Sequence, residues 1–117
     1  MINLDYQSRT PIYEQIINEI EKFVSLGILK PKEQILSIRE MASTLGINPN
    51  TVKKAYSELE NRGVIQTIST KGTFIAQDTD KVKSEKIDSE INEIKKKIVE
   101  LEKLGITKEE IIKKINE

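Results

Sequence analysis

The 117-residue sequence contains no cysteine, no histidine and no tryptophan. Without cysteine the chain can form neither a disulfide framework nor a thiolate metal site. Without histidine it lacks the usual zinc ligand and the usual near-neutral general base. Acid–base catalysis would fall to carboxylates, lysine or tyrosine. An enzyme is therefore the weaker hypothesis, and we expect no catalytic residues, no metal and no cofactor.

The sequence also lacks an excess of charge of one sign and a long apolar run. Nineteen Lys and Arg residues balance nineteen Asp and Glu residues, so a polyanionic partner would have to be recognised by a local patch. No stretch reaches the roughly 18 consecutive apolar residues of a membrane span, and residues 1–7 do not resemble a signal peptide. These absences predict a cytoplasmic protein with no membrane partner.

Three amphipathic segments with helix start and stop signals occupy the first half of the chain. Apolar residues at helical spacing predict a helix over residues 11–26, which begins at a proline and ends before a glycine. Ser37 and Glu40 have the spacing of a capping box and predict a second helix over residues 38–45. An Asn-Pro pair predicts a third helix over residues 49–62.

From Val64 the pattern changes to that of a β-hairpin. Residues 64–68 and 73–76 are rich in β-branched and aromatic side chains, and they flank a polar tip at residues 69–72. Three helices followed by a hairpin predict a winged helix-turn-helix domain over residues 1–77. Its expected core residues are Ile16, Ile20, Met41, Leu45, Val52, Tyr56, Leu59 and Phe74.

The last third of the chain is strongly charged but carries one apolar seam with heptad-like spacing. Gly105 ends this segment, and Thr107 and Glu110 form a second capping box before a last short helix. The seam is too apolar to face water, so a second copy of the chain is its natural cover. Residues 78–117 are thus predicted to be a helical dimerisation region. The seam consists of Ile87, Ile91, Ile94, Ile98 and Leu101.

Basic residues are concentrated between residues 30 and 72. This segment holds seven basic residues against four acidic ones, whereas acidic residues are in excess on both sides of it. The exposed face of the third helix carries Asn50, Thr51, Lys53 and Lys54, which suits a helix lying in the major groove of DNA. The competing interpretation is a solvated helix surface, and the helix-turn-helix pattern and hairpin together argue against it.

Two other kinds of site are disfavoured. The carboxylate pairs Glu58 with Glu60 and Glu109 with Glu110 would point in different directions on a helix, so they cannot act on one substrate bond. A tail of two helices leaves no room for a drug-sized pocket of roughly 300 Å³ or more. We therefore expect no ligand site inside a single subunit, with enclosed space only between tails or between tail and head.

Several short motifs follow one another over about the first two-thirds of the chain. They are Pro11 to Ile16, Gly27 to Pro31, Ser37 to Ala42, Leu45 to Val52, Ala55-Tyr56, Leu59-Glu60, Gly63 to Ile65 and Gly72 to Ile75. In this order they resemble the GntR family of bacterial transcription regulators, and in detail its small YtrA-like subfamily.

The resemblance implies a mainly α-helical chain with a small β wing, which binds a palindromic operator in double-stranded DNA as a homodimer, usually as a repressor. YtrA-like regulators are often linked to transporter operons. Two positions depart from the family pattern: Lys32 replaces the usual glycine and Leu36 the usual proline. Residues matching family DNA contacts are Ser37, Arg39, Asn48, Asn50, Thr51, Lys53, Lys71 and Gly72, to which the exposed-face pattern adds Lys54.

The leading hypothesis is a sequence-specific DNA-binding homodimer that represses transcription. The alternative is a winged-helix protein-interaction or assembly module whose third helix faces a partner protein. The wing residues Ile68, Ser69 and Thr70 lack the glycine and arginine common in the family, which leaves minor-groove contact by the wing open. The sequence does not identify the operator, the regulated genes or a small-molecule effector.

Overall fold

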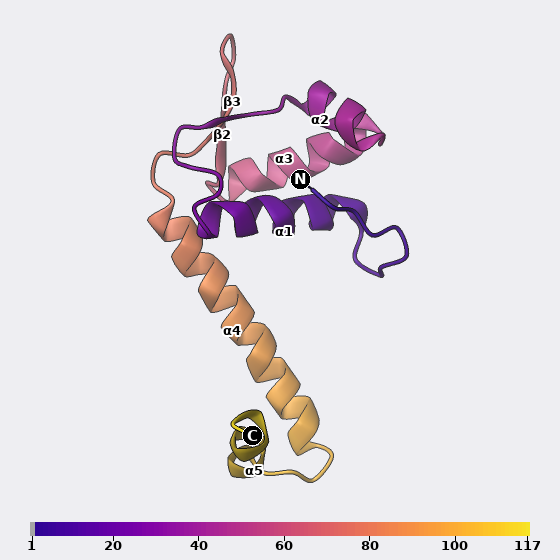
Figure 1. The fold of residues 1–117 in the computed structure, drawn as a ribbon, viewed down its shortest axis with the longest axis vertical. Coiled ribbons are helices and arrows are strands. Elements are labelled where there is room, and N and C mark those ends of the chain that lie inside the picture. The colour runs from indigo at the N-terminus through magenta and orange to yellow at the C-terminus, as the bar shows by residue number, and fades with distance from the viewer. Residues whose placement is uncertain (1) are drawn as a thin grey trace. The chain divides into compact units, whose positions relative to one another are not determined.

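The computed structural model describes residues 2–117, whose helices and strands are drawn in Figure 1. By its internal contacts the chain divides into a first unit that runs to Lys83, which we call the head, and a second unit, Ser84–Glu117, which we call the tail. We placed the boundary after Gln77, but α4 (Asp80–Glu102) begins within the head. Val82 on its first turn is 4% exposed and joins the head core.

The head has three helices: α1 (Ile12–Ser25), α2 (Ile38–Leu45) and α3 (Pro49–Asn61). All three were predicted. Both halves of the capping box between Ser37 and Glu40 are formed at the start of α2. Gly46 ends α2 in the left-handed conformation with φ of 67°, which glycine adopts without steric cost. A tight turn then leads into α3, as the sequence indicated.

The head core lies where α1 and α2 pack against α3. Two of the expected core residues, Leu45 and Phe74, are only half-buried. Phe74 lies on the outer face of its strand because side chains alternate between faces, and Ile75 fills the core instead, with 1% exposure. The residues below 2% exposure with the largest side chains are Ile16, Ile17, Ile20, Leu59, Ile75, Val52 and Val64.

A three-stranded antiparallel sheet lies beside these helices in the order β1-β3-β2. The hairpin of β2 (Ile65–Ile68) and β3 (Gly72–Ile75) was predicted, and Figure 1 shows it projecting beyond the helices of the head. Strand β1 (Gln34–Ile35) was not predicted. It pairs with β3, so that Gln34 stands opposite Phe74.

Lys32 precedes β1 and has φ of 67°, the conformation for which the family pattern has glycine. Its backbone N–H donates to the Ile75 carbonyl oxygen over 2.9 Å, and the Ile75 N–H donates to the Glu33 carbonyl oxygen over 2.8 Å. These two bonds to β3 hold the loop that leads to α2. The replacement of glycine by Lys32 is therefore accommodated with the loop still attached to the sheet.

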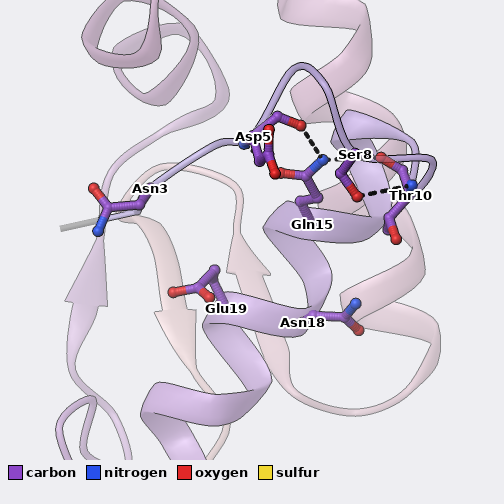
Figure 2. A pocket seen from close by; sticks show the side chains of 7 residues that line it. All are labelled: Asn3, Asp5, Ser8, Thr10, Gln15, Asn18 and Glu19. Atoms are coloured by element: carbon purple, nitrogen blue, oxygen red, sulfur yellow. Dashed lines mark hydrogen bonds between the residues drawn. The ribbon is translucent and has the colours of Figure 1, made fainter.

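The segment before α1 is held by Gln15 (Figure 2). The Gln15 side chain accepts a hydrogen bond from the Asp5 N–H over 2.8 Å and donates to the carbonyl oxygens of Asp5 and Thr10, each over 2.9 Å. One amide side chain thus ties two points of the N-terminal segment to α1. The hollow beside it measures about 220 Å³, which is below the size of a drug-sized ligand site.

The tail contains the rest of α4 and the helix α5 (Lys108–Ile115). The capping box between Thr107 and Glu110 is formed, and Ile111 is 4% exposed, both in line with the sequence. The predicted apolar seam lies on one continuous helix. Most of its side chains are nevertheless exposed, and whether a second chain covers them stays a prediction.

The head itself contains a groove of about 650 Å³ whose apolar lining includes Phe23, Leu29 and Ile35. Our expectation that a single subunit has no space of this size was wrong, because residues of α1, of α2 and of the segment around β1 enclose one together. Nothing in residues 2–117 indicates what occupies the groove. Within residues 2–117, the helices are either too short or too polar to span a bilayer.

Candidate nucleic-acid interface

The first turn of α2 presents Arg39 to solvent and fixes Ser37 locally. The Ser37 hydroxyl accepts a hydrogen bond from the Glu40 N–H, and the Glu40 carboxylate accepts one from the Ser37 N–H, each over 3.1 Å. The Ser37 backbone and side-chain bonds lower the pKa of Glu40. The Ser37 hydroxyl therefore serves the cap at the start of α2.

The turn before α3 and the first turns of α3 carry the next group of predicted contacts. The Asn48 side chain accepts a hydrogen bond from the Asn50 N–H over 2.9 Å, which leaves the Asn48 amide NH2 as a donor. Asn50 and Lys53 are exposed, and Thr51 is half-buried. These polar side chains lie at the N-terminal end of the helix that follows the turn, as in a recognition helix.

The two neighbouring lysines of α3 have different surroundings. Lys53 is exposed and takes part in no ion pair among residues 2–117. The Lys54 ammonium lies 3.9 Å from the centre of the Tyr13 ring of α1, a cation–π contact that draws it toward the neighbouring helix. This geometry favours Lys53 as a DNA contact and gives Lys54 a contact within the head.

Tyr56 joins α3 to the segment that enters α2. Its hydroxyl donates to the Leu36 carbonyl oxygen over 2.7 Å, and burial is the main cause that raises its pKa well above the usual tyrosine range. The phenol is thus a neutral donor at physiological pH. Because Leu36 directly precedes Ser37, this bond fixes the start of α2 relative to α3, the two helices that carry most of the predicted contacts.

The wing carries the remaining predicted contacts, Lys71 and Gly72. Its turn is closed by the Lys71 N–H, which donates to the Ile68 carbonyl oxygen over 2.8 Å. The Thr67 hydroxyl donates to the Glu60 carboxylate and thereby ties β2 to the end of α3. Lys71 is exposed, and the hairpin projects beyond the helices, so its tip can reach DNA beside the recognition helix.

The carboxylates of this region have local hydrogen-bond partners, whereas three of its basic side chains have no ion pair. Within residues 2–117, Arg39, Lys53 and Lys71 take part in no ion pair, and all three are exposed. The acidic residues of the same region each have a local partner. Glu33 accepts from the Lys30 N–H, Glu40 from Ser37, Glu58 from the Arg62 guanidinium and Glu60 from Thr67. Of these four carboxylates Glu58 is paired with a cation and the others accept from neutral groups; Arg39, Lys53 and Lys71 have no carboxylate partner and can face an anionic partner.

Sequence reasoning missed two polar contacts that shape this region. Arg62 at the end of α3 donates to Glu21 of α1 over 3.1 Å, and Glu21 is 6% exposed. A glutamate on the apolar side of the predicted first helix was the available signal. Gln34 of β1 reaches the wing turn and donates to the Lys71 carbonyl oxygen. A two-residue strand has no periodicity, so that contact could not be predicted from the sequence.

The sequence and the fold have counterparts in known proteins. The family model for bacterial regulatory proteins of the gntR family matches residues 12–75. The HTH-type transcriptional repressor YtrA of Bacillus subtilis is 41% identical over 101 residues, which are 86% of this chain and 75% of that protein.

Two solved structures are also similar. A transcriptional antiterminator from Listeria monocytogenes is 48% identical with a TM-score of 0.80, and the match covers 99% of this chain and 87% of that one. The DNA-binding domain of AraR in complex with operator ORR3 is 27% identical with a TM-score of 0.55, and the match covers 63% of this chain and 89% of that one.

The matched span contains all of α1, α2, α3 and the wing, and thus every exposed cation discussed above. One of the similar structures holds the same kind of domain on operator DNA. The chain therefore belongs to the GntR family of bacterial regulatory proteins, and it is a DNA-binding transcription regulator rather than an enzyme.

Proposed function

We propose that this regulator binds an inverted-repeat operator as a homodimer, with α3 of each subunit in the major groove. The observation that carries the proposal is the set of exposed cations without ion pairs, Arg39, Lys53 and Lys71, one on each reading element. Arg39 at the start of α2 and Lys53 on α3 approach the major groove and its phosphates, and Lys71 on the wing approaches the flanking backbone. Asn48, Asn50 and Thr51 supply further polar contacts at the start of α3.

The proposed dimer is built by the tail. On α4, Ile87, Ile91 and Ile94 are 52%, 45% and 53% exposed, which is unusual for three isoleucines on one face of a helix. A second copy of the same seam would cover them. A two-fold dimer presents two identical recognition helices, so the operator has two half-sites centred roughly 10 base pairs apart or at a multiple of that distance.

The proposed outcome of binding is repression. YtrA carries the name of a repressor, whereas the similar Listeria structure carries that of an antiterminator, so the direction of regulation needs its own measurement. A reporter gene behind the selected operator, with and without the regulator, gives that measurement. By analogy with the YtrA-like subfamily, the proposed target is an operon for a transporter.

Selection from random duplexes tests the proposed binding mode. The purified chain should enrich sequences with dyad symmetry, and its affinity for them should fall steeply as salt rises, because each neutralised phosphate releases a counterion. If the recognition helix instead faced a partner protein, no duplex would be enriched, and any weak DNA binding would be independent of sequence. Enrichment of a single asymmetric half-site would contradict the dimeric arrangement.

A further inference from the structure

The side chain of Gln34 crosses from the edge strand β1 to the wing turn. Its Nε2 atom donates a hydrogen bond to the Lys71 carbonyl oxygen over 3.1 Å, between residues 37 positions apart in the sequence. Gln34 stands opposite Phe74 on the central strand, and its amide therefore extends along the sheet toward the tip. The contact joins the strand that leads to α2 with the turn that carries Lys71.

Gly72 makes room for this contact. A Cβ atom at position 72 would lie 2.6 Å from the Gln34 Nε2, so any other residue would push the amide away from the Lys71 carbonyl. Gly72 also has φ of 119°, a conformation that side-chain-bearing residues rarely adopt. Gly72, which matches the family pattern at the wing, is thus also the residue against which the Gln34 amide lies.

The β2–β3 ladder ends at the pair of Ile68 with Gly72, and the residues between these two form the wing turn. Ile68, Ser69, Thr70 and Lys71 are all exposed, and the hydrogen bond from the Lys71 N–H to the Ile68 carbonyl closes the turn without joining it to the rest of the head. The Gln34 side chain donates to the Lys71 carbonyl oxygen, so Lys71 is hydrogen-bonded through both its N–H and its carbonyl group. These two bonds hold the peptide groups on either side of Lys71.

We propose that Gln34 is a positioning residue for the wing, which orients Lys71 for its contact with the DNA backbone. This inference rests on the proposed function, because it takes the wing as a DNA contact. Gln34 acts through Lys71 and touches no DNA itself. Without the Gln34 hydrogen bond the turn can move. Ordering the Lys71 side chain on binding then costs free energy, and the affinity for the operator falls.

The variant Gln34→Met tests this role because methionine keeps the length of the side chain and removes the amide donor. The chain offers a matched control, Gln66→Met. Gln66 is also an exposed glutamine opposite Phe74, but it lies on the other side of β3, in β2. Both variants are measured alone and combined with Lys71→Ala, against the operator selected by the wild-type protein and at several salt concentrations.

Gln34→Met should weaken operator binding roughly 2- to 10-fold, the range that one hydrogen bond contributes, and Gln66→Met should leave it unchanged. Lys71→Ala should reduce the slope of log affinity against log salt concentration by about 1, which corresponds to the loss of one phosphate contact. Adding Gln34→Met to Lys71→Ala should then cause no further loss, because the two residues act as a unit. Wild-type affinity for Gln34→Met, or an equal loss with and without Lys71, would overturn the proposal.

Backbone relaxation of residues 69–72 in the free protein supplies a readout that does not depend on DNA. Gln34→Met should raise the mobility of these residues, and Gln66→Met should not. Unchanged mobility in Gln34→Met would also overturn the inference. A wild-type protein that selects no DNA would refute the proposed function instead, and the relaxation measurement would still test whether Gln34 holds the turn.

Discussion

Isoleucine has opposite surroundings in the head and in the tail. Ile16, Ile17 and Ile20 on α1 are at most 2% exposed, whereas Ile91 and Ile94 on α4 are about half exposed. Both helices repeat isoleucine at helical spacing, but the isoleucines of α1 are buried within the head whereas those of α4 remain exposed. A helix needs a second apolar surface to bury its own. The head supplies one, whereas the tail buries Ile111 but leaves most of the α4 seam exposed.

Charge divides the two regions in the same way. In the tail, lysines pair with glutamates along the same helix, as in the contacts of Lys96 with Glu93 over 3.1 Å and Lys97 with Glu100 over 3.3 Å. Such exposed pairs contribute little to stability. In the head, Arg39, Lys53 and Lys71 take part in no ion pair within residues 2–117, whereas Glu58 is paired with Arg62. The unpaired cations suit the head to DNA, and the exposed isoleucines of α4 are the basis of the proposed pairing of the tail with a second copy.

The largest expected effect comes from making the open seam polar. Ile94→Asp with Ile98→Asp would place four like charges in a two-fold seam, where desolvation and repulsion both oppose pairing. The chain should become monomeric, and operator affinity should fall roughly 10³-fold or more, toward non-specific binding. Sedimentation and gel-shift measurements check both effects.

The matched control for the seam is Ser89→Asp with Asn92→Asp. Both residues are exposed on α4, away from the seam by helical spacing, and the change in charge is the same. This variant should remain a dimer with operator affinity close to that of the wild type. A seam variant that stays dimeric with full affinity would show that the tail is not the dimerisation element.

The next effect distinguishes the two lysines of α3. Arg39→Ala and Lys53→Ala should each weaken operator binding by about 1–3 kcal/mol if they contact a base edge, with relaxed specificity at one position. Lys54→Ala should weaken it less, because Lys54 already contacts the Tyr13 ring. Binding titrations against the selected operator check the order. A larger loss for Lys54→Ala than for Lys53→Ala would reverse our assignment of the pair.

A smaller effect is expected within the head itself. Tyr56→Phe removes the hydrogen bond to the Leu36 carbonyl and should lower the free energy of unfolding by about 1 kcal/mol. Tyr6→Phe is the control, because Tyr6 is 67% exposed. Thermal or denaturant unfolding measures both variants. Equal stabilities would mean that the Tyr56 bond does not secure the entry to α2.

The smallest effect is one of pH on the α2 cap. The hydrogen bonds from Ser37 lower the pKa of Glu40 in the folded state, so the contribution of the cap is complete above the unfolded-state pKa and is lost as pH falls through the folded-state pKa. Glu40→Gln should keep the cap and remove this pH dependence. A carboxyl NMR titration checks the direction: Glu40 titrating in the ordinary glutamate range would contradict it.

The sequence predicted the helices of the head and the hairpin because each has a local signal. The Ser37 capping box, the glycine after α2 and the alternation around the wing depend on near neighbours in the chain. The apolar seam of α4 was equally visible from its spacing. These features set the fold class and the likeness to the family without any tertiary information.

The contacts that the sequence did not predict join residues far apart in the chain. Strand β1 is two residues long and exists because β3 lies beside it. The contact of Lys54 with Tyr13 and that of Gln34 with Lys71 depend on how whole elements pack. Sequence spacing therefore identified the exposed lysines of α3, and the structure was needed to separate Lys53 from Lys54.

The mass of the protein–DNA complex tests most directly whether the head reads DNA and the tail pairs two heads. Native mass spectrometry is carried out on the wild-type chain with a duplex that holds the full selected operator, and with a second duplex of equal length in which one half-site is scrambled. Two chains should bind the full operator tightly, and the scrambled duplex should bind with much lower affinity. One chain on the full operator, or equal affinity for both duplexes, would contradict the account.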